Sequence, residues 1–165
     1  MQINLKASLA LALLLQATSM VEARGINLHW LWHNHCTECH GHAGDFARKF
    51  LNVSNGELQG VHHVHDLREF MRNHYLSDND VDAIYNMLLA QASIPPRFKE
   101  ECSSCHNTAA DFVSNSLELR DGVLYGRKTG APIRQFLSHH RKLNSEDIEF
   151  FMVQLSRVAN EVFRP

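Results

Sequence analysis

The pentapeptide Cys-x-x-Cys-His occurs twice in this chain of 165 residues, at positions 36–40 and 102–106. Two thiols at this spacing can form thioether bonds to the two vinyl groups of one haem, and the histidine that follows is placed to bind the iron. We therefore predict two covalently bound haem c groups. The predicted attachment and iron-binding residues are Cys36, Cys39, His40, Cys102, Cys105 and His106.

Two other uses of paired cysteines stay open at this point. Disulfides are common in exported proteins, and four cysteines can hold one zinc ion. All four cysteines of the chain lie in the two motifs. Neither rival explains why a histidine follows each pair immediately, so haem attachment is the favoured interpretation.

The N-terminal stretch 1–23 is typical of a secretory signal peptide. Lys6 supplies the positive charge, Ala7 to Leu15 form an apolar run too short to cross a bilayer, and small residues precede a cleavage point after Ala23. An uncleaved anchor is the alternative. We expect a periplasmic protein with no membrane span after cleavage, and both motifs lie in the part that follows the cleavage point.

The formal net charge is −2 at pH 7 with histidine neutral. A nucleic-acid partner is not expected for a chain with this charge. The partners that we expect are redox proteins, a donor and an acceptor that the sequence does not identify.

The chain repeats itself with the offset that separates the two motifs, 102 − 36 = 66. The same offset superposes Arg68-Glu69-Phe70 on Arg134-Gln135-Phe136 and His74 on His140. A single insertion then changes the offset to 147 − 80 = 67, which places Asp80 on Asp147. A repeat of this kind predicts two copies of one haem-binding unit. We place the first at 24–93 and the second at 94–165, joined near the prolines 95 and 96.

Each copy shows the same order of local signals. We expect a leading helix before each motif (25–35 and 96–101), a short helix after it (45–51 and 111–117), a hairpin and a second short helix (67–73 and 133–139). Asn55-Gly56 and Asp121-Gly122 favour the tight turn of a hairpin. The expected fold class is mainly α, with two tandem units that each hold a few short helices and a small hairpin.

The last helix of each copy has the clearest pattern. Ser77-x-x-Asp80 and Asn144-x-x-Asp147 resemble capping boxes at its start. Apolar residues follow at helical spacing: Val81, Ile84, Tyr85 and Leu88 in the first copy, and Ile148, Phe151, Met152 and Leu155 in the second. This spacing predicts one buried face, and core packing is the favoured reading of it.

On its attachment motifs the chain resembles a dihaem c-type cytochrome, and each copy is similar in outline to class I cytochrome c. The resemblance implies covalent haem, maturation outside the cytoplasm and electron transfer. Class I members usually supply a methionine as the second iron ligand. Here Met71, Met87 and Met152 meet other residue types under the repeat, so no methionine recurs in the mature chain.

Besides the attachment histidines, one histidine recurs in both copies. His74 follows His40 at the same interval at which His140 follows His106, since 74 − 40 = 140 − 106. We therefore predict bis-histidine iron in both units, with His74 and His140 as the second ligands. Capping of a helix end by these two histidines is the alternative. His139 is a possible competitor of His140, although its counterpart is an asparagine.

Two further features of the first copy have no counterpart in the second. The histidines 62, 63 and 65 are read as a solvated loop that contacts haem propionates, with metal binding or replacement of His74 as the alternative. Trp30 and Trp32 are read as core residues.

The predicted function is an electron carrier that moves one electron per haem, because iron with histidine on both faces has no open position for a substrate. Two alternatives remain: a haem enzyme or gas-binding cytochrome with one open iron position, and a cytochrome subunit of a larger oxidoreductase complex. Of these interpretations, an electron-transfer protein is favoured over an enzyme.

Overall fold

The computed structural model describes residues 25–61 and 66–164. The predicted signal peptide and its cleavage point after Ala23 lie outside the described residues, as does the histidine-rich stretch 62–65. No helix in the described ranges is both long enough and apolar enough to cross a bilayer.

The described chain is mainly helical, with two small antiparallel hairpins, and this confirms the predicted mainly α class. The first half contains α2 (Leu28–His35), α3 (Thr37–His40), α4 (Ala43–Phe50), β1 (Leu51–Ser54), β2 (Glu57–Gly60), α5 (Leu67–Arg72) and α6 (Asp78–Ser93). The second half contains α7 (Arg97–Glu101), α8 (Ala109–Ser116), β3 (Leu117–Arg120), β4 (Val123–Gly126), α9 (Ile133–Leu137) and α10 (Ser145–Val162).

Both hairpins turn where the sequence predicts. Strand β1 pairs with β2 and β3 pairs with β4, each across a two-residue loop. The loop residues have positive φ angles, at 53° for Asn55, 79° for Gly56, 49° for Asp121 and 76° for Gly122. Positive φ at both central positions is the signature of a type I′ turn, whose twist matches that of the strands.

The capping prediction is right for one long helix and wrong for the other. At the start of α10 the side chain of Asn144 accepts a hydrogen bond from the N–H of Asp147, and Asp147 accepts one from the N–H of Asn144. At the start of α6 the Ser77 hydroxyl donates to the Asp80 carboxylate at 2.6 Å instead. The serine therefore bonds a side chain in place of the backbone of the first turn.

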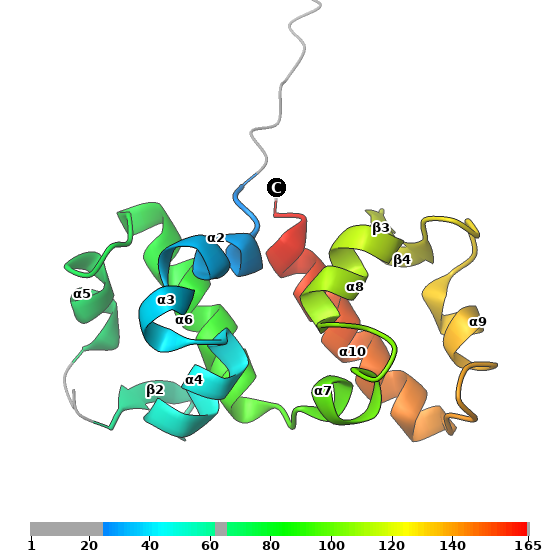
Figure 1. Cartoon of the computed structure of the whole chain (residues 1–165), viewed down its shortest axis with the longest axis horizontal. Helices are drawn as coiled ribbons and strands as arrows, with labels where there is room; N and C mark the ends of the chain where they lie inside the picture. Colours follow the sequence, from blue (N-terminus) through cyan, green and yellow to red (C-terminus); the bar gives the residue numbers. More distant parts are fainter. Residues whose placement is uncertain (1–24, 62–65, 165) are drawn as a thin grey trace, which may run out of the picture.

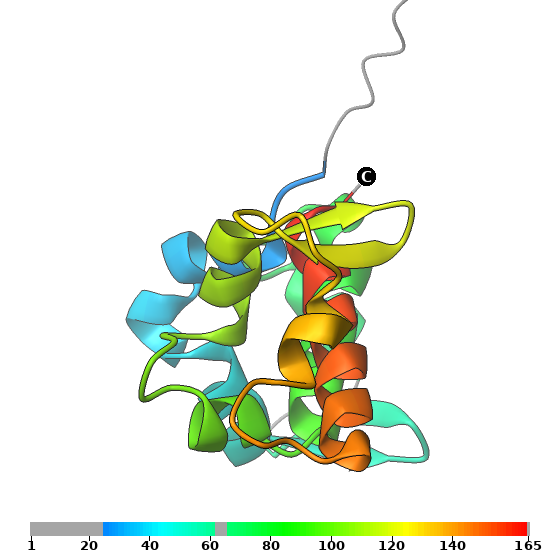
Figure 2. The ribbon, with the colours of Figure 1, turned by 90° about the vertical axis from the view of Figure 1, so that its right-hand side faces the viewer.

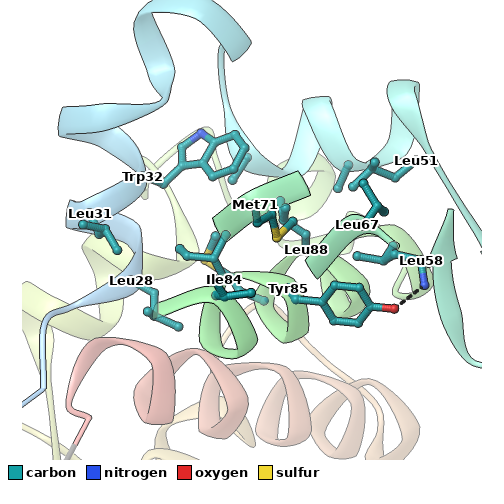
Figure 3. Close-up of a cluster of buried hydrophobic side chains, with 14 residues drawn as sticks. Leu28, Leu31, Trp32, Leu51, Leu58, Leu67, Met71, Ile84, Tyr85 and Leu88 are labelled. Atoms are coloured by element: carbon teal, nitrogen blue, oxygen red, sulfur yellow. Dashed lines mark hydrogen bonds between the residues drawn. The ribbon is translucent and has the colours of Figure 1, made fainter. Parts of the chain in front are cut away.

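The predicted apolar stripes pack into two separate hydrophobic clusters, one in each half. In the first, Ile84 and Leu88 of α6 lie beneath Trp32 and Met71, as Figure 3 shows. The Tyr85 hydroxyl accepts a hydrogen bond from the N–H of Leu58 at 2.8 Å, which ties α6 to the hairpin (Figure 3). The second cluster is centred on residues of α8, α9 and α10: Val113, Leu137, Phe151, Leu155 and Val158.

The two tryptophans do not share one environment. Trp32 is buried, and its indole N–H donates to the carbonyl of Gly41 at 2.9 Å. Trp30 is 55% exposed, so the prediction that it belongs to the core is wrong. The reason is helical geometry: α2 turns Leu28, Leu31 and Trp32 inward, and position 30 then falls on the outer side.

The long helices α6 and α10 stand in the middle of the molecule, and α5 and α9 lie at its opposite ends (Figure 1). Seen from the side, α9 lies beside α10, and the β3–β4 hairpin lies near the C-terminal end of α10 (Figure 2). Two polar contacts join the halves: His29 Nε2 lies 2.8 Å from a carboxylate oxygen of Glu161, and Lys99 forms an ion pair with Asp45 at 2.8 Å.

The two long helices also have matched arginine contacts at their first turns. Arg97 binds Asp147 at 2.7 Å, and Arg164 binds Asp80 at 3.3 Å. Asp80 and Asp147 are equivalent under the repeat. Arg97 follows Asp80 at the same interval at which Arg164 follows Asp147, since 97 − 80 = 164 − 147. An arginine just beyond the end of each long helix therefore contacts the start of the other one.

Shortening one core leucine in either half should reduce stability by a similar amount. Leu88 and Leu155 are each 1% exposed, and truncation of such a residue to alanine costs about 2–5 kcal/mol through lost burial and a cavity. Chemical denaturation followed by circular dichroism measures this for Leu88→Ala and Leu155→Ala. The control is Val153→Ala, which removes a side chain that is 67% exposed and should change stability by about 0.5 kcal/mol or less. Equal stability of all three variants would contradict the assignment of the cores.

Candidate functional site

One helical turn presents the reactive groups of each motif. The N–H of His40 donates to the carbonyl of Cys36 at 2.9 Å, and the N–H of His106 donates to the carbonyl of Cys102 at the same distance. The N–H of the second cysteine donates to that same carbonyl at 3.2 Å in both halves. The turn therefore places two thiols and an imidazole in the same local arrangement twice.

The four cysteines differ in exposure in the same way in both motifs. Cys36 and Cys102 are half-buried, whereas Cys39 and Cys105 are exposed. No disulfide joins any two of these four cysteines in the structure. Burial raises the pKa of the Cys36 thiol, and burial together with the Glu101 carboxylate raises the pKa of Cys102.

The structure brings each attachment histidine next to the histidine that the repeat assigns as its partner. The ring centres of His40 and His74 are 5.8 Å apart, and those of His106 and His140 are 6.3 Å apart. The two planes of each pair are crossed, at 67° in the first half and 54° in the second. Histidines that are distant in the sequence thus face one another in both halves.

This separation fits two imidazoles that bind one metal ion from opposite sides. A metal–imidazole bond is about 2 Å long and the ring nitrogen lies about 1 Å from the ring centre, so the expected separation of the ring centres is about 6 Å. Within the described ranges, no three or more His, Cys, Asp or Glu side chains gather as a metal site. Two protein ligands would suit a haem, whose porphyrin would supply the remaining nitrogen ligands.

Aromatic rings surround the attachment histidines, and sequence reasoning missed this role. Phe46 lies edge-on to His40 with ring centres 4.7 Å apart, and Phe112 lies against His106 at 4.6 Å. Trp32 and Phe98 complete the two sets at 6.1 Å and 6.3 Å from the histidine rings. The signal was present, since each of these aromatic residues has an aromatic counterpart at the equivalent position of the repeat.

The backbone after the second histidine of each pair adopts an unusual conformation. Tyr75 has a φ angle of 61° and Arg141 one of 58°, although neither is glycine. Left-handed backbone at such residues costs about 1 kcal/mol or more and persists where the surroundings determine it, often at functional sites. The two residues are equivalent under the repeat, so this local strain recurs beside His74 and beside His140.

In the second half the paired histidines line a cavity of about 440 Å³. Its other walls are mainly apolar and aromatic, from four elements: Phe98, Phe112, Phe136, Leu137, Phe151 and Leu155. The same lining also contains two basic and three acidic side chains: Arg141, Lys142, Glu100, Glu101 and Asp147. The apolar walls and the two basic side chains would suit a porphyrin, which has an apolar ring and anionic propionates.

Both halves favour the neutral form of one histidine in each pair. Burial lowers the pKa of His40, and the charge on His74 lowers it further. Burial also lowers the pKa of His140, with smaller contributions from His106 and Arg141. Because a metal binds the neutral imidazole, these shifts favour the binding-competent form near neutral pH.

His139, the neighbour considered as a competitor, makes a different contact. Its Nδ1 lies 3.1 Å from the carbonyl oxygen of Gln135 and 3.0 Å from the Ser138 hydroxyl. His140, in contrast, faces His106. The structure therefore brings His140, and not His139, to the attachment histidine of the second half.

Arg97 fixes the chain segment that leads into the second motif. It forms ion pairs with Glu101 at 2.5 Å and Asp147 at 2.7 Å, and its guanidinium lies over the Phe150 ring at 4.6 Å. The hydrogen bond from Arg97 is the main cause that lowers the pKa of Asp147, and the bond to the N–H of Asn144 adds to it.

Replacement of Arg97 should therefore make the free energy of unfolding less dependent on pH in the acidic range. The folded-state pKa of Asp147 lies below its unfolded value, so the stabilisation by Arg97 is present above about pH 4 and is lost as the pH falls through the folded pKa. Arg97→Gln should be less stable than the wild type at pH 6, and the difference should shrink below pH 4. Thermal melting across this range measures it. Arg97→Lys, which keeps the charge, should retain the pH dependence, and a constant difference at all pH values would contradict the account.

Comparison with known proteins gave no match: no family model fits the chain, and neither the curated proteins nor the solved structures contain a significant relative.

Proposed function

We propose that this protein is an exported dihaem c-type cytochrome that carries one electron per haem, with bis-histidine iron in both halves. The observation that carries the proposal is the spacing of the two histidine pairs, 5.8 Å and 6.3 Å between ring centres, each beside a Cys-x-x-Cys-His turn. Each half therefore contains a pair of histidines at a separation suitable for a metal ion, together with two thiols that could form thioether bonds.

The roles of the residues follow from their positions. Cys36 and Cys39 would hold one haem, and Cys102 and Cys105 the other, through thioether bonds. His40 with His74, and His106 with His140, would bind the two irons as neutral imidazoles. Bound haem supplies reversible one-electron chemistry between ferric and ferrous iron. The Phe46 and Phe112 rings pack against the attachment imidazoles and would help to hold them in place.

The crossed histidine pairs favour a carrier over an enzyme or a gas-binding protein. An open iron position requires the second histidine to lie away from the first. In both halves, however, the ring centre of the second histidine lies within 6.3 Å of the ring centre of the attachment histidine. Two histidine ligands also favour a lower reduction potential than the His/Met pair of class I cytochromes. The donor and acceptor are proposed to be redox proteins of the periplasm.

Visible absorption and low-temperature EPR spectroscopy of the purified ferric protein test the proposal. Two low-spin haem signals, with no methionine-to-iron band at long wavelength, are the expected result. A high-spin signal in the wild-type protein, or carbon monoxide binding after reduction, would favour the haem enzyme or gas-binding alternative. Isolation of the protein from the periplasm in a stable complex would favour the subunit of a larger oxidoreductase.

A further inference from the structure

We propose that Phe136 and Phe70 are positioning residues that fix the planes of the second iron-binding histidines, an inference that depends on the proposed bis-histidine function. The Phe136 ring stacks on that of His140 with centres 4.6 Å apart and planes 28° apart. The Phe70 ring stacks on that of His74 at 5.0 Å and 22°. The same contact therefore occurs in both halves.

Helical spacing explains why the contact forms twice. Phe70 precedes His74 by four positions, and Phe136 precedes His140 by four. Each phenylalanine lies on a short helix, α5 or α9, and each histidine lies just beyond its end. Side chains at this spacing lie on the same side of a helical turn, which brings the two rings face to face.

The stacking matters because the ring plane of an iron-binding histidine has to be held in place by its surroundings. An imidazole that binds a metal normally donates its other N–H to a carbonyl or carboxylate, which fixes the orientation of the ring. The stacked phenylalanine is a contact of this kind that both halves share, and it can set the ring plane of the histidine.

The two halves differ in one respect that provides an internal comparison. In the first half the Tyr75 ring also contacts His74, edge-on, with centres 5.3 Å apart. In the second half the equivalent residue is Arg141, which donates to the carbonyl of Glu101 and contributes no ring. Without Phe70, the His74 ring still contacts Tyr75. Without Phe136, the His140 ring has no such second aromatic contact from the following residue, so we expect it to be less restrained.

The consequence would be measurable in the iron spectra. The g-values of a low-spin ferric haem depend on the angle between the planes of its two imidazole ligands. Loss of the stacked phenylalanine should also weaken the binding of the histidine to the iron. The fraction of iron that has released this histidine should then rise about two- to tenfold. Both effects are local to one haem.

The test compares Phe136→Leu, Phe136→Tyr and Phe70→Leu with the wild-type holoprotein. EPR of the ferric form and carbon monoxide binding to the reduced form are the two measurements. We expect Phe136→Leu to shift one low-spin signal and to raise carbon monoxide binding at one haem about two- to tenfold. Phe136→Tyr keeps the ring and should match the wild type, whereas Phe70→Leu should show a smaller effect on the other signal.

The outcomes separate this inference from the proposed function. If the wild-type protein has no low-spin bis-histidine signals, the proposed function itself fails. If the wild type has them and Phe136→Leu leaves both signals and carbon monoxide binding unchanged, the positioning role is wrong. Phe136 is 43% exposed, so a variant that merely loses packing would lower the melting temperature without moving one EPR signal.

Discussion

The double variant Cys102→Ser/Cys105→Ser is expected to carry one haem in place of two and to lose cooperative melting of its second half. Without the two thiols no thioether bond forms at the second motif, so the haem absorbance of the purified protein should fall to about half of the wild-type value. The second half would then have an unfilled cavity of about 440 Å³, open to solvent, beside its small core.

Haem quantification and differential scanning calorimetry measure the two effects. The matched control is Ser103→Ala/Ser104→Ala, which changes the two residues between the same cysteines and should keep both haems. The variant Cys36→Ser/Cys39→Ser should show the same loss in the first half. Full haem content in either cysteine variant would contradict covalent attachment at that motif.

The second large effect is expected from removal of one second ligand. His140→Ala would leave an iron with His106 on one side only, so one of the two haems should become high-spin and bind carbon monoxide when reduced. His74→Ala should do the same at the other haem. In both variants the unaltered half should keep its low-spin signal.

His139→Ala is the matched control for this experiment, since it removes the adjacent histidine, which contacts Gln135 and Ser138. Both haems of this control should stay low-spin. A low-spin spectrum from His140→Ala together with a high-spin one from His139→Ala would reverse the assignment of the ligand in the second half.

Much of the fold could be predicted because its signals are local. The Asn-Gly and Asp-Gly turns specify the hairpins through backbone conformation alone, and the apolar spacing of α6 and α10 specifies which face is buried. The repeat added the non-local information. It paired His40 with His74 and His106 with His140, and the structure brings these rings together.

The features that sequence reasoning missed depend on three-dimensional placement. Trp30 and Trp32 lie close together on one helix, so only the position of the core shows which of them is buried. The contacts of Arg97 and Arg164 at the first turns of α10 and α6 arise from the packing of the two halves, which no local pattern records. The capping box of α6 does not form, and the Ser77 hydroxyl donates to the Asp80 carboxylate.

Covalent haem attachment can be tested by the mass of the purified protein after complete denaturation, combined with a haem stain of the denatured band. We expect a mass that exceeds that of the polypeptide by two haem groups, and a band that retains haem peroxidase activity. A colourless band with the mass of the bare polypeptide would contradict covalent haem attachment and, with it, the proposed electron-transfer function.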